Sequence, residues 1–201
     1  MQNAEFRIQK QFRILNSAAF VLFLAAASIA SAAENTLLAA AERGDRTAAL
    51  SLIAKGSNPN TPGADGTTPI MWAAANADVE LVRALIKAGA NVKATNQFGT
   101  SALTEASIIG SAPVIDALLK AGADPNTRNP EGETALMAAA RSGKVDAAKR
   151  LVQAGADVNA RESFGGQSAL MWASAQSQAE MVRFLVEAGA DANARGVIRQ
   201  W

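Results

Sequence analysis

The residues that most often carry catalysis are missing from this chain of 201 amino acids, which has no histidine, no cysteine and no tyrosine. Their absence removes the commonest general base, the commonest metal ligand and the serine–histidine and cysteine–histidine nucleophile arrangements. It also removes any thiolate metal site and any disulfide framework. Carboxylates remain, but no pair of them stands out as an acid–base couple. We therefore predict a protein that is not an enzyme and that needs no cofactor.

Acidic and amide side chains recur at a fixed spacing and could in principle hold a metal ion. They form two columns, one of Asn91, Asp124, Asp157 and Asp191 and one of Asn60, Asn126, Asn159 and Asn193. A calcium site needs several oxygens that converge from one irregular loop, whereas these residues lie a repeat apart. Aspartate and asparagine commonly hydrogen-bond the backbone of turns. We interpret both columns as turn residues and predict no metal site.

Two tryptophans, Trp72 and Trp172, each stand in a Met-Trp-Ala triplet and could anchor a partner, since tryptophan is enriched in interface hot spots. The alternative is that they pack between helices. Glu105 and Ala138 occupy the same position in intervening segments, and a position that accepts glutamate is unsuited to a deep core. We predict that this position is partly exposed, and both interpretations stay open.

The elements that position these residues are set by an internal repeat. One glycine series has spacings of 33, 33, 33 and 34 residues, and a second has spacings of 33, 33 and 34. The first comprises Gly56, Gly89, Gly122, Gly155 and Gly189; the second comprises Gly66, Gly99, Gly132 and Gly166. Agreement of two series, including the single extra residue near Glu162, indicates a solenoid of stacked units.

Each unit is predicted to hold two helices. Ser or Thr at 68, 101, 134 and 168 is suited to cap the first helix, and the glycine of each A-G-A or K-G-S segment is suited to end the second. Pro113 falls in the first turn of a second helix, where proline is tolerated. The apolar faces predicted for the second helices are Val79, Val82, Leu85 and Ile86; Val114, Ile115, Leu118 and Leu119; Val145, Ala148, Leu151 and Val152; and Met181, Val182, Leu185 and Val186.

These segments resemble the ankyrin repeat, whose pattern is a turn glycine, T-P-L-H-x-A, a second helix and G-A-D-x-N. Residues 66–74, GTTPIMWAA, follow it most closely, and 99–107, GTSALTEAS, depart from it most. Met71, Thr104, Met137 and Met171 replace the histidine of that pattern, so these turns are expected to rely more on packing. The resemblance implies an all-α solenoid of helix-turn-helix units with short β-hairpin-like turns.

The predicted division of the chain follows the repeat. A leader spans 1–33, and the ankyrin-repeat domain spans 34–195 in units of about 34–63, 64–96, 97–129, 130–163 and 164–195. The first unit lacks the turn glycine and is interpreted as an N-terminal cap. Residues 196–201 are interpreted as an incomplete C-terminal tail, because no polar capping helix follows the last unit.

The resemblance implies that partners bind a concave face made by the hairpin tips and the first helices. Phe98 and Phe164 are the clearest candidates there because each lies in a turn beside glycine, although they could instead cover the hairpins of their own units. The candidate partner-binding residues are Asp65, Trp72, Asn76, Phe98, Ile108, Ile109, Glu131, Arg141, Phe164, Trp172 and Gln176.

The leader has the three parts of a secretory signal: basic residues Arg7, Lys10 and Arg13, the apolar run 18–30, and small residues that allow cleavage after Ala32 or Ala33. The alternative is that the leader is not cleaved and that residues 14–33 anchor the protein in the membrane. We expect no other part of the chain to contact a membrane. Without the leader, 16 basic and 17 acidic residues remain, a net charge of −1. This balance gives no reason to expect a nucleic-acid partner.

The sequence therefore favours a non-enzymatic scaffold that binds a protein of unknown identity, in the bacterial periplasm or secreted, without a small-molecule substrate. The alternative is the recruiting module of a larger enzyme or host-directed effector whose C-terminal part is missing. The assignment to protein binding rests partly on analogy with the ankyrin family, since one fold can carry many functions.

Overall fold

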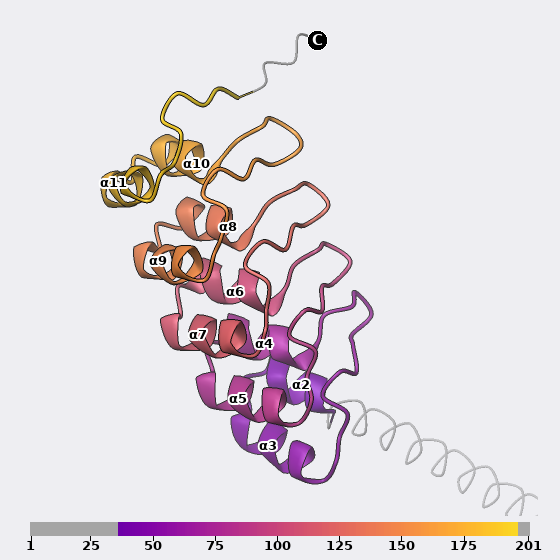
Figure 1. Ribbon diagram of the computed structural model, residues 1–201. Helices are drawn as coiled ribbons and strands as arrows, with labels where there is room; N and C mark the ends of the chain where they lie inside the picture. The colour runs from indigo at the N-terminus through magenta and orange to yellow at the C-terminus, as the bar shows by residue number, and fades with distance from the viewer. Residues whose placement is uncertain (1–35, 197–201) are drawn as a thin grey trace, which may run out of the picture.

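The computed structural model describes residues 36–196, which form ten helices arranged as five stacked helix-turn-helix pairs (Figure 1). The helices lie in two rows along the stack, and the loops project from one side of it. Within residues 36–196, no helix has the length and apolar character needed to cross a membrane. The secretory signal predicted for 1–33 lies outside the described residues.

The first helix of each pair belongs to the inner row, and we call these the inner helices. They are α2 (Leu37–Glu42), α4 (Pro69–Ala75), α6 (Ala102–Ile109), α8 (Ala135–Arg141) and α10 (Ala169–Ala175). Of the four hydroxyl caps predicted from sequence, that of Thr68 is absent, because its buried hydroxyl has no hydrogen-bond partner among the described residues. Ser101 accepts a hydrogen bond from the backbone N–H of Thr104 at 3.1 Å. Thr134 and Ser168 cap α8 and α10 in the same way.

The second helix of each pair belongs to the outer row, and we call these the outer helices. They are α3 (Arg46–Ala54), α5 (Val79–Lys87), α7 (Ala112–Lys120), α9 (Val145–Gln153) and α11 (Ala179–Glu187). The predicted glycine stops are confirmed, because the glycine after each outer helix has a positive φ between 84° and 92°. Pro113 lies in the first turn of α7, as predicted.

The core runs continuously along the stack between the two rows. Each inner helix packs on the next inner helix, and each outer helix packs on the next outer helix as well as on its own inner partner. Alanines such as Ala73, Ala106 and Ala139 are fully buried on the inner helices and let neighbouring backbones approach closely. Leu85, Leu118 and Leu151 fill the outer side. No unit buries its faces alone, and the stack supplies the missing contacts.

The predicted faces of the outer helices need two corrections. Leu81 and Ala147 are omitted from the predicted sets yet are fully buried, because an outer helix is contacted by both neighbours and by its inner partner. Val186 was placed on the buried face of α11 but is 46% exposed. This prediction was wrong because α11 packs on α9 and α10 only, among the described helices.

The methionines in place of the family histidine are mostly packing groups, as expected. Met71 and Met137 are buried at 2% exposure, and the backbone N–H of Thr68 lies 3.5 Å from the Met71 sulfur. Thr104 differs, since its hydroxyl also lies 3.1 Å from that of Ser101. The turn of the third unit therefore has a hydrogen bond between two hydroxyls, whereas in the second unit the Thr68 N–H donates to the Met71 sulfur.

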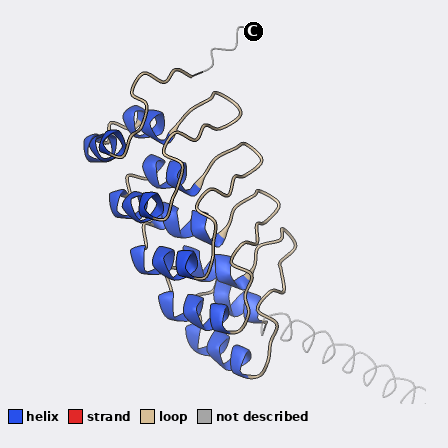
Figure 2. Ribbon diagram, in the orientation of Figure 1, coloured by secondary structure: helices blue, strands red, loops and turns tan. Residues whose placement is uncertain are grey.

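The loops between units are hairpin-shaped, and within residues 36–196 they contain one isolated antiparallel bridge, Thr95 to Ser101, and no strand (Figure 2). Neighbouring hairpins are joined by backbone hydrogen bonds from Gln97 to Asp65 at 2.8 Å and from Ser163 to Glu131 at 2.6 Å. Pro130 holds the equivalent place between them and has no N–H to donate. The hairpins therefore lie edge to edge along one side of the helix stack.

The aspartate and asparagine columns are turn residues, which confirms that interpretation. Asn91, Asp124, Asp157 and Asp191 each accept a hydrogen bond from the backbone N–H two residues later. The amide of Asn126 spans two units, donating to the Gly155 carbonyl and accepting from the Asp157 N–H. Asn60 and Asn159 do the same, and we call these three residues the asparagine ladder.

Candidate functional site

A hollow of about 300 Å³ lies in the corner between the hairpins and the inner helices, and we call it the Trp72 pocket. Three of the predicted partner-binding residues, Asp65, Trp72 and Phe98, line it together. Asp65 and Phe98 come from two successive hairpins, whereas Trp72 comes from α4. The remaining lining residues are Thr67, Met71, Ala75, Asn96, Thr100 and Glu105. The repeat thus brings together residues that are separated by a full unit in the sequence.

The large apolar side chains predicted at the hairpin tips and at the end of α6 are exposed. Phe98 is 61% exposed, Phe164 is 67% exposed and Ile109 is 45% exposed, while Ile108 is partly buried. The alternative that the phenylalanines cover their own hairpins requires burial, which these exposures do not show. Apolar groups of this size on a surface are typical of interaction sites.

The two tryptophans are half-buried, as predicted for their position, but their surroundings differ. Trp72 packs against the core with one side and lines the pocket with another. The ring of Trp172 is covered by the guanidinium of Arg141, 5.5 Å from the ring centroid. Arg141 also approaches the Glu133 carboxylate at 3.3 Å. Two of the predicted binding residues, Arg141 and Trp172, therefore bind each other.

Glu105 lines the Trp72 pocket and was not among the predicted binding residues. Burial raises the pKa of its carboxyl above the ordinary glutamate value, and desolvation is the sole cause. By contrast, the hydroxyl and N–H of Thr67 lower the pKa of Asp65 by hydrogen-bonding its carboxylate. The signal for Glu105 was in the sequence, since it occupies the tryptophan position of its unit.

Other predicted binding residues also have structural contacts. Asn76 donates a side-chain hydrogen bond of 2.9 Å to the Ala41 carbonyl and so ties α4 to the preceding inner helix. Glu131 accepts the inter-hairpin bond through its backbone, leaving its side chain exposed. Gln176 is exposed at the C-terminal end of α10. None of these three residues lines the Trp72 pocket.

Comparison of the sequence with protein-family models identifies the family to which the chain belongs. The model described as ankyrin repeats, three copies, matches residues 37–129 and again 110–196. The chain belongs to the ankyrin-repeat family. Proteins of this family are generally protein–protein interaction modules and are typically non-enzymatic. No curated protein matches the chain.

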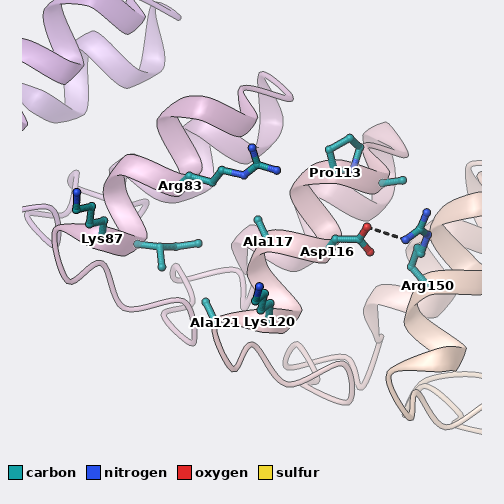
Figure 3. Close-up of a pocket in the computed structure, with 10 residues that line it drawn as sticks. Arg83, Lys87, Pro113, Asp116, Ala117, Lys120, Ala121 and Arg150 are labelled. Carbon is teal, nitrogen blue, oxygen red and sulfur yellow. Dashed lines mark hydrogen bonds and ion pairs between the residues drawn. The ribbon is translucent and has the colours of Figure 1, made fainter.

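A second hollow lies on the outer face of the ankyrin-repeat stack, between α5 and α7, with a volume of about 690 Å³ (Figure 3). Arg83 extends from α5 toward α7, and Asp116 points to Arg150 of α9 at 2.6 Å. The other charged side chains, Lys87 and Lys120, are exposed. Five of its ten lining residues are charged, three are alanines, and the other two are Ile86 and Pro113. None of the predicted partner-binding residues lines this hollow. We place the candidate site in the Trp72 pocket.

The ankyrin-repeat domain has no metal-binding constellation within residues 36–196, where no three histidine, cysteine, aspartate or glutamate side chains gather. Glu105 and Asp65 are the carboxylates of the Trp72 pocket, and Asp65 is engaged by Thr67. The side chains that line this pocket can take part in aromatic stacking, charge pairing and hydrogen bonding.

Proposed function

We propose that this ankyrin-repeat protein is a non-enzymatic scaffold that binds a protein partner through its concave face, made by the inner helices and the hairpins. The observation that supports the proposal best is the exposure of large apolar side chains on two hairpins and at the end of one inner helix. Phe98, Ile109 and Phe164 are exposed there, and Trp72 borders a hollow between two units. Hot spots in protein interfaces are enriched in large aromatic residues that seat in such pockets.

The full set of residues proposed to contact the partner is the predicted one with Glu105 added. Arg141 and Trp172 would contribute as a stacked pair, because the guanidinium already covers the indole. Asn76 would contribute less, since its amide is engaged with Ala41. The binding energy is expected to concentrate at Trp72 and Phe98, where apolar area meets a hollow.

We also propose that the protein acts in the bacterial periplasm or is secreted, which rests on the leader sequence alone. Basic residues, an apolar run and small residues follow one another there in the order of a secretory signal. The mass of the protein isolated from cells tests it. A species that begins at Ala33 or Glu34 supports cleavage, whereas an intact N-terminus supports the alternative anchor over 14–33.

The binding function is tested by capture of partners from a periplasmic extract. The wild-type array is compared with a variant carrying Trp72→Ala, Phe98→Ala and Trp172→Ala. A matched control carries Arg83→Ala, Lys87→Ala and Lys120→Ala on the outer face, and circular dichroism checks that both variants fold. We expect the concave-face variant to lose the partner and the outer-face control to keep it.

Equal recovery of every partner by both variants would refute the concave-face proposal. The same experiment covers the alternative function as a recruiting module of a larger enzyme or effector, because that function would use the same face.

A further inference from the structure

Glu105 is a carboxylate whose position the fold does not explain. It is half-buried in the Trp72 pocket, and its carboxylate makes no hydrogen bond or ion pair to any described residue. It lies in the first turn of α6, where the helix dipole favours a negative charge. Desolvation outweighs that benefit, because the pKa of this carboxyl is raised and not lowered. The desolvated carboxylate of Glu105 destabilises the folded protein, and we therefore look for a ligand whose positive charge would pair with this carboxylate.

The surroundings of Glu105 define what that ligand must be. The pocket also contains the indole of Trp72, the exposed ring of Phe98 and the carboxylate of Asp65. No lysine or arginine lines it. Two carboxylates beside two aromatic rings attract a cation, since ring faces and carboxylates are both electronegative. The missing complement is therefore a positively charged side chain.

The molecule contains its own example of such a contact at the other tryptophan. Trp172 occupies the position of Trp72 in the fifth unit, and the Arg141 guanidinium lies 5.5 Å from its ring centroid. The same guanidinium approaches the Glu133 carboxylate at 3.3 Å. At that site the chain supplies the aromatic ring, the carboxylate and the arginine. The Trp72 pocket supplies a ring and a carboxylate, and its carboxylate comes from the tryptophan position of the following unit.

We propose that the Trp72 pocket binds an arginine side chain of the protein partner, an inference that rests on the proposed concave-face function. Trp72 stacks on the guanidinium, Glu105 forms the charge-assisted hydrogen bonds, and Phe98 covers the aliphatic stem. Arginine fits better than lysine because its planar, weakly hydrated head group stacks on aromatic rings and pairs with a carboxylate through two N–H groups. Asp65 adds negative potential while its oxygens stay bonded to Thr67.

The test is a titration of the isotopically labelled protein with acetyl-arginine methylamide, followed by nuclear magnetic resonance at the tryptophan indole N–H signals. Acetyl-citrulline methylamide, which is neutral and of the same shape, and acetyl-lysine methylamide are the comparison probes. Two variants are titrated alongside, Glu105→Gln and, as a charge-matched control on the exposed outer face, Glu187→Gln. Both substitutions are conservative, and the spectra themselves show whether each variant folds.

We expect the arginine probe to shift the Trp72 indole signal saturably, with the signal of Trp172 unaffected. The citrulline probe should bind at least about fivefold more weakly, and Glu105→Gln should weaken the arginine probe by a similar factor, because a charge-assisted pair is lost in both cases. Glu187→Gln should leave the affinity unchanged. Equal binding of citrulline or lysine, an unaltered affinity in Glu105→Gln, or no saturable shift would each overturn the proposal.

A partner-capture experiment separates this inference from the function on which it rests. If Glu105→Gln captures partners as well as the wild type while the Trp72, Phe98 and Trp172 triple variant does not, the arginine subsite is wrong and the concave face stands. If the triple variant captures everything, the concave-face function is wrong, whatever the probe titration shows.

Discussion

A single position of the repeat carries different chemistry in successive units. It holds Trp72, Glu105, Ala138 and Trp172 in turn, and the fold tolerates all four because the position lies at the edge of the core. The buried alanine fills space, whereas the half-buried glutamate loses hydration without gaining a partner. Sites that bind ligands often keep such unfavourable groups at a cost to stability.

Replacing Glu105 by glutamine should stabilise the protein at neutral pH. The folded-state pKa of Glu105 is raised, so its carboxyl favours folding when protonated, and that contribution is lost as the pH rises through the folded-state pKa. Thermal unfolding followed from mildly acidic to neutral pH should show Glu105→Gln with a higher Tm than the wild type at neutral pH. The difference should shrink as the pH falls toward the ordinary glutamate pKa.

Glu131→Gln, at an exposed hairpin tip, serves as the control and should show no such pH-dependent gain. A lower Tm for Glu105→Gln at neutral pH would mean that the carboxylate supports the fold, contrary to the direction of its pKa.

Gly99 should tolerate alanine much less well than Gly56 does. Both have a positive φ, 70° and 84°, so alanine costs about 1–2 kcal/mol of backbone strain at either position. At Gly99 the new Cβ would also lie 2.7 Å from the Cα of Asn129 and would overlap Pro130, while at Gly56 it meets nothing within 4 Å. Urea unfolding should show Gly99→Ala less stable than Gly56→Ala by a further 1–3 kcal/mol or so. Equal losses would contradict this packing of hairpin on hairpin.

At the scale of elements, side-chain amides in the turns after the outer helices join successive units. Asn60, Asn126 and Asn159 each reach the glycine carbonyl and the backbone N–H of the next unit. Lys93 occupies the same place between the second and third units and offers no amide. The asparagine ladder is therefore interrupted at one junction, whereas the helix packing on either side of it continues.

Lys93→Asn should extend the ladder and stabilise the array. By analogy with Asn60 and Asn126, the new amide would donate to the Gly122 carbonyl and accept from the Asp124 N–H. An exposed pair of hydrogen bonds of this kind is worth about 0.5–1.5 kcal/mol. Urea unfolding of Lys93→Asn beside Lys93→Ala measures it. If asparagine gives no more stability than alanine, the ladder does not contribute as proposed.

At the scale of the whole molecule, every unit contacts only its neighbours, so the stack is a one-dimensional array. Interior units are covered on both sides, and α11 is covered on one side among the described helices. The exposure of Val186 is the direct consequence. The Trp72 pocket exists only in the array, since two successive units line it.

Removing a buried leucine should therefore destabilise more helices when the leucine lies in a middle unit of the stack than when it lies in the last described unit. Leu118 of α7 and Leu185 of α11 are both fully buried, and either leucine-to-alanine change removes about 2–5 kcal/mol of local packing. Hydrogen exchange should show Leu118→Ala weakening protection in α5 and α9 as well as in α7. Leu185→Ala should affect α10 and α11 and leave α4 to α7 protected. A uniform loss across all helices in both variants would indicate a single cooperative unit.

Much of this architecture was predictable from the sequence because it depends on local chemistry repeated in register. Glycine stops with positive φ, hydroxyl caps such as Ser101, and the aspartate turns each depend on a few neighbouring residues, and five copies make the pattern unmistakable. The place of Phe98 and Phe164 beside turn glycines made them candidates for exposure, but the sequence left open that they cover their own hairpins, and their exposure is seen only in the structure. The resemblance to ankyrin repeats carried the assignment of the concave face, and the family match supports the family itself.

The tertiary structure decided what depends on contact between units. Only there does Glu105 meet Trp72 and Phe98 across a pocket, and only there does the Arg141 guanidinium lie over the Trp172 ring. The burial of Leu81 and the exposure of Val186 also depend on which helices pack against α5 and α11. The sequence by itself determined the repeating unit, because its turns and caps are local. Stacking determined the candidate site, because desolvation of a carboxylate and stacking of a guanidinium arise only between neighbours.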